Sequence, residues 1–226
     1  MELDHLKESW EDSRDVYRLI KAVYPAFDLY ADLDVPPEDW EALHQIESKT
    51  NARLRDELGE GALVEEQDRV KGPGASFIMA AFTHVNPMGS RFSDGTYGVY
   101  YSAPLEETCV REVDFHTTRF MADTQEPPQS MAFRFVKAEL KGSNYNLYCQ
   151  DWEWLRSENY ARCQELGRQV RSVVDFIIYG SVRHPGNDAY AVFRPRALSA
   201  ARHSRFVEMY WDGERITHSS GVEYQI

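Results

Sequence analysis

The stretch from Ser90 to His116, SRFSDGTYGVYYSAPLEETCVREVDFH, predicts a turn, a strand and a helix in close succession. Ser93 to Gly95 is a turn sequence, and the β-branched and aromatic residues of Thr96 to Ala103 are typical of a strand. The proline that follows, with two glutamates shortly behind it, predicts the first turn of a helix. Arg91 therefore lies just before the turn, and Glu112 lies about two turns into the helix.

Strand signals dominate the chain beyond residue 70, with helices expected over Leu105 to Phe115 and across Leu155 to Val170. Asp212 and Gly213 predict a two-residue hairpin turn. This mixture predicts an α+β fold around a mixed or antiparallel sheet, and no G-x-G-x-x-G motif supports a doubly wound one. The predicted strands share β-branched and aromatic residues: Ser76 to Val85, Thr96 to Ala103, Met131 to Leu140, Val173 to Tyr179, Asp188 to Phe193 and Arg205 to Trp211.

The first part of the chain predicts helices instead. Asp15 to Val23 carries apolar residues at i, i+3, i+4 and i+7, which indicates an amphipathic helix. A second helix is expected from Pro36 to Gly59, since two prolines and two acidic residues precede a discontinuous apolar stripe. Turn-rich sequence near residue 70 then separates a helical N-terminal extension, 1–70, from the main domain, 71–226.

Composition narrows the class of protein. The 226 residues are 42% hydrophobic, which is ample for a packed core, and no run approaches the ~18 apolar residues of a membrane helix. The charged beginning, MELDHLKESWEDSRD, does not resemble a signal peptide, so we expect a cytoplasmic protein without a membrane partner. A net charge of -12 argues against direct nucleic-acid binding, which needs a basic surface.

The cysteines indicate a reducing compartment and no structural metal. Cys109, Cys149 and Cys163 are odd in number, widely spaced and not combined with histidines at metal-ligand intervals. Cys109 precedes Glu112 by three residues, so a reactive thiol near it is conceivable. A small core residue is the favoured interpretation.

A third segment, Phe176 to Pro195, places Ser181 between two predicted strands. Arg91, Glu112 and Ser181 match, in order, the arginine, glutamate and serine for which the RES domain is named. The chain resembles this family over roughly residues 75 to 200, and three motifs in the right order are more specific than any one.

The resemblance implies an ADP-ribosyltransferase-like split sheet with flanking helices, in which NAD+ binds in a cleft and no metal takes part. It also implies the toxin of a bacterial toxin–antitoxin pair, which breaks the nicotinamide–ribose bond of NAD+ and arrests growth. An Xre-type antitoxin would occlude the cleft in an oligomeric complex. The shared motifs leave the acceptor of ADP-ribose open: a protein, or phosphate or water with depletion of NAD+.

The residue types suit this chemistry. Arg91 can bind pyrophosphate oxygens bidentately, and Glu112 can face the ribose where positive charge develops. Ser181 can hydrogen-bond a phosphate or a ribose hydroxyl. Tyr100 or Tyr101 would stack on nicotinamide; only one of them can face the cleft, because adjacent strand residues point to opposite faces, and the family register favours Tyr101.

Arginines near these segments concentrate positive charge in an acidic protein: Arg91, Arg111, Arg119, Arg183 and Arg194. We expect Arg194 to join Arg91 in contacting NAD+, although arginines at strand ends also commonly pair with surface carboxylates.

Other interpretations stay open. Glu112 could be an exposed helical glutamate, although Thr108 and His116, its i, i+4 neighbours, offer no opposite charge. A serine hydrolase that uses Ser181 and His184 is disfavoured, because the sequence around Ser181 lacks the second glycine of the G-x-S-x-G nucleophile elbow. From another class, a sensor could bind NAD+ or another nucleotide without cleaving it, or an interaction module could carry an inactive cleft. Glu112 argues against the sensor, because pure binding of an anion does not need it.

Overall fold

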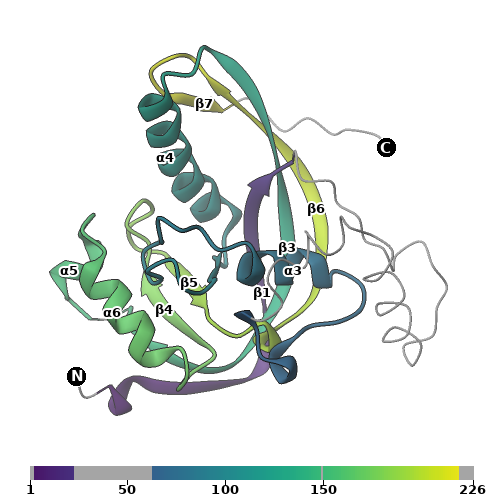
Figure 1. Cartoon of the computed structure of the whole chain (residues 1–226), viewed down its shortest axis with the longest axis vertical. Helices are drawn as coiled ribbons and strands as arrows, with labels where there is room; N and C mark the ends of the chain where they lie inside the picture. Colours follow the sequence, from purple (N-terminus) through teal and green to yellow (C-terminus); the bar gives the residue numbers. More distant parts are fainter. Residues whose placement is uncertain (1–2, 23–62, 149, 219–226) are drawn as a thin grey trace.

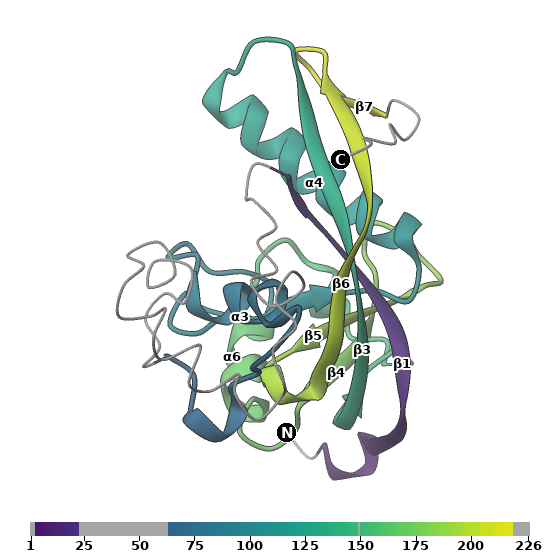
Figure 2. The ribbon, with the colours of Figure 1, turned by 90° about the vertical axis from the view of Figure 1, so that its right-hand side faces the viewer.

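The structure is a computed structural model that describes residues 3–22, 63–148 and 150–218. Its central strand, β3 (Gln129–Asn146), pairs antiparallel along one side with β1 (Lys7–Lys21). Figure 2 shows β1 running beside β3. On the other side, β6 (Leu198–Trp211) pairs antiparallel with the first part of β3, and β4 (Phe176–Gly180) pairs in parallel with its last three residues. The sheet therefore divides into two parts that share β3 (Figure 1).

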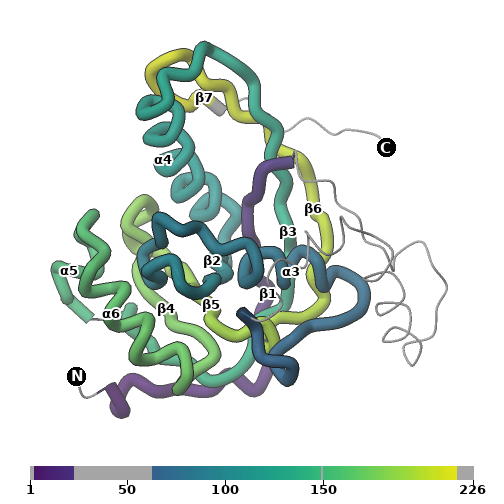
Figure 3. Tube along the Cα trace, in the orientation of Figure 1, coloured from purple at the N-terminus to yellow at the C-terminus, as the bar shows by residue number. Residues whose placement is uncertain are grey.

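The part that contains β4 closes on itself through β1. β4 pairs with β5 (Asp188–Val192), and β5 pairs with β2 (Tyr100–Ser102), both antiparallel. Figure 3 shows β2 beside β5. Beyond β2, the amides of Tyr17 and Ala103 donate to each other's carbonyl at 2.8 and 2.9 Å. This bridge brings β1 against the end of β2 and the start of the helix that follows.

The described strands form one seven-stranded mixed sheet, and helices flank it. Figure 1 shows α4 beside the upper part of the β3–β6 pair and α6 beside β4. The helices and remaining short elements are η1 (Asp4–Leu6), η4 (Glu66–Asp68), α3 (Ala75–Thr83), α4 (Glu106–Thr124), α5 (Glu153–Arg156), α6 (Ala161–Val170), η5 (Pro195–Ala197) and β7 (Ile216–His218). The predicted α+β class with a mixed sheet and flanking helices is confirmed.

Apolar side chains fill three clusters around this sheet. Tyr100 and Phe176 belong to the cluster that packs α3 against the closed part of the sheet. Ile177, on the opposite face of β4, packs towards α6. Phe135 belongs to the third cluster, beneath α4. β4 is thus buried on both faces, which explains its continuous apolar sequence.

The predicted helix at Asp15 to Val23 is wrong, because its residues up to Lys21 belong to β1. Val16 is fully buried in the cluster of Tyr100, while Leu19 is buried in the cluster beneath α4. Since apolar residues are buried on both faces of β1 there, they do not alternate with polar ones, and their spacing imitates a helix. The second predicted helix, Pro36 to Gly59, lies outside the described residues, and the division into 1–70 and 71–226 stays a prediction.

The predicted strand at Ser76 to Val85 is also wrong, because α3 occupies this segment up to Thr83. Ile78, Met79 and Phe82 are all buried, at the i, i+1 and i+4 spacing of one helix face. The strand-like composition was misleading here because packing against the sheet overrides intrinsic β propensity.

The remaining elements differ from prediction mainly in extent. β2 is shorter than Thr96 to Ala103, and α4 is longer than Leu105 to Phe115. Four residues, Asp212 to Arg215, connect the paired Trp211 and Ile216, so the predicted two-residue hairpin is wrong in length. The helix expected across Leu155 to Val170 is two helices, α5 and α6. None of the described helices is long and apolar enough to cross a membrane.

Candidate active site

A cavity of about 560 Å³ lies among β1, β2, α4 and the loop that precedes β2. Its size falls within the range of about 300–1,000 Å³ that is usual for small-molecule sites. α4 contributes one helical face to the lining, from Thr108 and Cys109 through Glu112 to His116. Arg91, from the loop before β2, and Tyr101, from β2, also line the cavity.

Glu112 is fixed in this cavity by the chain segment after β4. The Ser181 hydroxyl donates a 2.6 Å hydrogen bond to Glu112 Oε1, and the Arg183 amide lies 3.4 Å from the same oxygen. Glu112 Oε2 makes no hydrogen bond with the described residues, so it is available to a ligand. Ser181 does not itself line the cavity; it is 5% exposed and acts on it through Glu112.

The position of Ser181 follows from the hairpin between β4 and β5. Gly180 and Asp188 are the last paired residues of that hairpin. Beyond them, the Ser181 amide donates to the Asn187 carbonyl at 2.8 Å, and the Ser181 hydroxyl accepts from the His184 amide at 3.0 Å. The hydroxyl is therefore held at the sheet end that faces α4.

Arg91 is buried, with 8% of its surface exposed. Its Nη1 donates to the carbonyls of Leu155 and Ser157 at 2.7 and 3.1 Å, and its guanidinium lies 4.6 Å from the ring centroid of Tyr160. Arg91 thus ties the loop before β2 to α5 and also presents positive charge to the cavity.

Tyr101 is the tyrosine of the pair that lines the cavity. Its hydroxyl accepts a 2.9 Å hydrogen bond from the Phe92 amide and lies 2.8 Å from the Ser90 hydroxyl. Tyr101 therefore fixes the loop that carries Arg91, and burial raises the pKa of its hydroxyl to about 12. Tyr100 is fully buried in the core on the other face of β2 and is not among the lining residues.

The family model of the RES domain matches residues 67–212. The chain belongs to the RES-domain family. A relative, the uncharacterized protein y4oC of Sinorhizobium fredii, is 28% identical over 209 residues, which cover 90% of this chain and 85% of the relative. Arg91, Glu112 and Ser181 all lie within the RES-domain match, and the fold brings them to the cavity or directly behind it.

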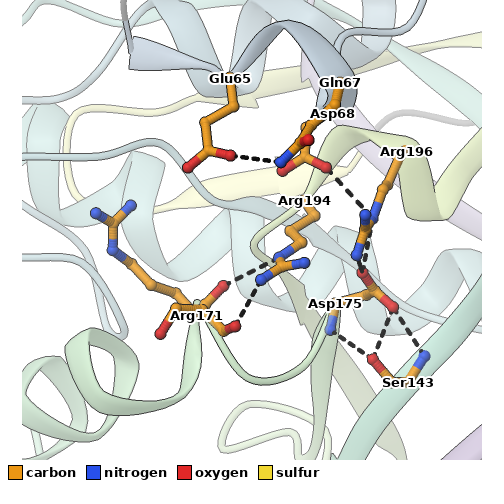
Figure 4. A network of polar contacts seen from close by, with 9 residues as sticks. Glu65, Gln67, Asp68, Ser143, Arg171, Asp175, Arg194 and Arg196 are labelled. Carbon is orange, nitrogen blue, oxygen red and sulfur yellow. Dashed lines mark hydrogen bonds and ion pairs between the residues drawn. The ribbon is translucent and has the colours of Figure 1, made fainter.

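Arg194 also lies within the RES-domain match, but it is not at the cavity. Its guanidinium donates to the carbonyls of Ser172 and Arg171 at 2.6 and 3.4 Å. Figure 4 shows it beside the network of Arg196 and Asp175. In this structure Arg194 caps the end of α6 and does not approach the other predicted NAD+ contacts.

Cys109 lines the cavity as a buried thiol. It donates to the Tyr17 carbonyl at 3.0 Å, and burial raises its pKa to about 12, so the thiolate is not available at neutral pH. Cys163 is also buried and free, while Cys149 lies outside the described residues. No group of three or more potential metal ligands occurs in the described part of the chain.

Sequence reasoning missed two features of the site. Arg18, from β1, lines the cavity although it precedes the RES-domain match. A charged residue between apolar neighbours was the available signal, but the helical interpretation of that segment hid it. Thr108 was missed as a contact of His184: its hydroxyl lies 2.9 Å from His184 Nδ1, a contact between residues far apart in the sequence.

Proposed function

We propose that this RES-domain protein cleaves the nicotinamide–ribose bond of NAD+ and transfers ADP-ribose to an acceptor, as the growth-arresting toxin of a bacterial toxin–antitoxin module. The observation that carries the proposal is the Glu112–Ser181 hydrogen bond, which holds a carboxylate in the cavity that Arg91 and Tyr101 also line.

The reaction needs little from acid–base groups. Nicotinamide leaves as a neutral molecule because its ring nitrogen is cationic in NAD+, so its departure needs no general acid. The ribose develops oxocarbenium character, and a fixed carboxylate stabilises that charge as carboxylates do in glycosidases. Glu112 Oε2 is available for this role or for binding a ribose hydroxyl, while Ser181 holds Oε1.

The other residues of the cavity position the substrate. Tyr101 offers an aromatic face for nicotinamide, and Arg91 offers guanidinium charge to the diphosphate. Arg91 has already committed Nη1 to two backbone carbonyls, so we assign it one part of phosphate binding and not all of it. Arg194 receives no role, since it bonds to carbonyls elsewhere.

The partners follow from the same proposal. The acceptor is a protein, phosphate or water, and an Xre-type antitoxin covers the cavity in the inactive complex. Phe120 supports such a cover, because it lines the cavity and is 53% exposed, which leaves an apolar ring for a partner to bury. Direct contact with nucleic acid is not part of the proposal, in keeping with the net charge of -12.

The test is a proton NMR time course of purified protein with NAD+, in which free nicotinamide is followed with and without phosphate and with a cell extract. Release that depends on phosphate identifies phosphorolysis, and release only with extract identifies a protein acceptor. If NAD+ binds but no nicotinamide is released under any condition, the protein is a sensor of NAD+ and the proposed enzymatic activity is wrong. Glu112→Gln should strongly slow release, whereas Asp123→Asn, an exposed position on the last turn of the same helix, should not.

A further inference from the structure

Arg18 is an arginine in the cavity wall that has no polar partner among the described residues. Its Nη1 is buried, and no hydrogen bond or ion pair joins Arg18 to the described residues. The guanidinium carbon lies 4.5 Å from the ring centroid of Tyr100, which covers one face of the guanidinium group. Burial lowers the pKa of Arg18, which reflects the cost of keeping this charge away from water.

A buried charge of this kind lowers the stability of the protein unless a ligand pairs with it. Buried charges in proteins are nearly always paired, because a buried donor without an acceptor costs the full desolvation of that group. The ring of Tyr100 offers a partial compensation, since a cation over an aromatic face is attracted to it, but it accepts no N–H bond in the guanidinium plane. The in-plane donors of Arg18 therefore lack acceptors among the described residues.

The surroundings of Arg18 favour an anion. The described lining contains three basic side chains of arginine or lysine, Arg18, Lys21 and Arg91, against the single carboxylate of Glu112. This is a local excess of positive charge in a protein whose net charge is -12. Because Arg91 gives Nη1 to carbonyls and Arg18 does not, Arg18 has more of its fork free for a planar or tetrahedral oxyanion.

We propose that Arg18 binds a phosphoryl group in this cavity, so that β1, a strand outside the RES-domain match, completes the substrate site. The inference rests on the proposed function for the identity of the ligand. The phosphoryl group belongs either to the diphosphate of NAD+ or to an inorganic phosphate acceptor. The Tyr17–Ala103 bridge holds β1 at the cavity, and Cys109 of α4 donates to the same strand.

The test variant is Arg18→Met, which replaces the charged side chain by an apolar one of similar length. Arg14→Met is the matched control. Arg14 lies on the same strand, with its guanidinium 3.7 Å from the ring centroid of Trp10, but it does not line the cavity. Isothermal titration calorimetry is run with NAD+, ADP-ribose, inorganic pyrophosphate and inorganic phosphate. Nicotinamide riboside, which has no phosphate, is the reference ligand.

Arg18→Met should weaken binding of the phosphate-bearing ligands by about 10- to 100-fold, as for a lost hydrogen bond to a charged group, and leave nicotinamide riboside unchanged. The melting temperature without ligand should stay the same or rise, because an unpaired buried charge is removed. Arg14→Met should leave the affinities for the phosphate-bearing ligands and for nicotinamide riboside unchanged. A loss for NAD+, ADP-ribose and pyrophosphate identifies the diphosphate, and a loss for inorganic phosphate alone identifies the acceptor.

Unchanged affinity for every phosphate-bearing ligand, or an equal loss for nicotinamide riboside, overturns the proposal. So does a lowered melting temperature with unchanged affinities, which would make Arg18 a structural residue. Nicotinamide release by the unaltered protein is measured in parallel. If binding of phosphates depends on Arg18 but NAD+ is not cleaved, the proposed reaction is wrong and the phosphoryl-binding role of Arg18 is supported. If Arg18→Met cleaves NAD+ as well as the unaltered protein does at limiting NAD+ and phosphate, the phosphoryl-binding role of Arg18 is wrong and the proposed reaction is supported.

Discussion

The hydrogen bond from Ser181 to Glu112 links the end of β4 to the middle of α4 across 69 residues of sequence. At 2.6 Å it is a short, charge-assisted bond, and it engages one of the two carboxylate oxygens of Glu112. Under the proposed function, this arrangement predicts separate tasks for the two residues: Ser181 orients the carboxylate, and Glu112 contacts the substrate.

Glu112→Gln should therefore cost more activity than Ser181→Ala. Removing the negative charge should lower kcat for nicotinamide release by about 10²–10³-fold, the loss typical of a single electrostatic group that acts on the transition state. Removing the hydroxyl should cost about 10- to 100-fold, equivalent to one hydrogen bond to a charged group. Nicotinamide release measured by NMR at saturating NAD+ checks both values.

The double variant separates orientation from direct contact. If Ser181 acts through Glu112, adding Ser181→Ala to Glu112→Gln should cost little more than Glu112→Gln alone. Fully additive losses would mean that Ser181 contacts the substrate itself. Circular dichroism of each variant is needed beside the kinetics, because Ser181 also accepts from the His184 amide.

Tyr100 and Tyr101 form a matched pair for phenylalanine substitution. Tyr101→Phe leaves the Phe92 amide without its acceptor and should lower the free energy of unfolding by about 1–3 kcal/mol. The Tyr100 hydroxyl is buried without a hydrogen-bond partner among the described residues, so Tyr100→Phe should be neutral or stabilising. Urea unfolding measures both. Equal effects would contradict the different environments of the two hydroxyls.

Gly167→Ala should destabilise the protein, although alanine is normally better than glycine inside a helix by about 0.5–1 kcal/mol. A Cβ at Gly167 of α6 would overlap the carbonyl oxygen of Phe92, the residue after Arg91. The helix or the loop must shift, and the shift should also weaken NAD+ binding. A higher melting temperature would show that the loop adapts freely.

Local signals predicted the elements around the site well, and long-range packing decided the rest. The turn, strand and helix from Ser90 onwards were found because their residues agree with their own structure. β1 was mistaken for a helix because Val16 and Leu19 are buried on opposite faces, a consequence of partners far away in the sequence. α3 was mistaken for a strand for the same reason, since packing on the sheet determines its state.

The site followed a similar rule. Arg91 and Glu112, which line the cavity, were selected from the order of motifs. Because adjacent strand residues point to opposite faces, only one of Tyr100 and Tyr101 could face the cleft, and the register of the family pattern favoured Tyr101. Arg194 does not line this cavity, because proximity in sequence to Ser181 says nothing about which end of a strand a residue occupies, and its contact with NAD+ stays a prediction. Arg18 was not found, because the helical interpretation of its segment hid a place in the wall that depends on the pairing of β1 with β3.

Asp175 anchors the polar network of Figure 4. Its Oδ2 accepts from the amide and hydroxyl of Ser143 at 2.9 and 2.7 Å, and its Oδ1 accepts from Arg196 at 3.1 Å. Asp175→Asn replaces one acceptor oxygen by a donor and should cost about 1–3 kcal/mol of unfolding free energy. Asp151→Asn, in an ion pair whose carboxylate is 90% exposed, should cost at most about 0.5 kcal/mol. Similar losses would mean that the network contributes little.

Stability should fall as the pH drops below neutrality, and His203 is one cause. Burial, and next the charge of Arg134, lower the pKa of His203 below its ordinary value of 6.5. Its Nδ1 is buried without a hydrogen-bond partner in the described part of the chain. As the pH falls through 6.5, the unfolded chain takes up a proton that the folded chain resists, so the free energy of unfolding decreases until the lower, folded-state pKa is passed.

His203→Gln removes this titration. In urea unfolding at pH 7.5 and pH 5.5, the variant should therefore lose less stability between the two conditions than the unaltered protein. The comparison at pH 7.5 serves as the reference for any change in packing against Phe206, whose ring centroid lies 4.5 Å from that of His203. An identical loss in both proteins would mean that the His203 ring is protonated as easily in the folded chain as in the unfolded one.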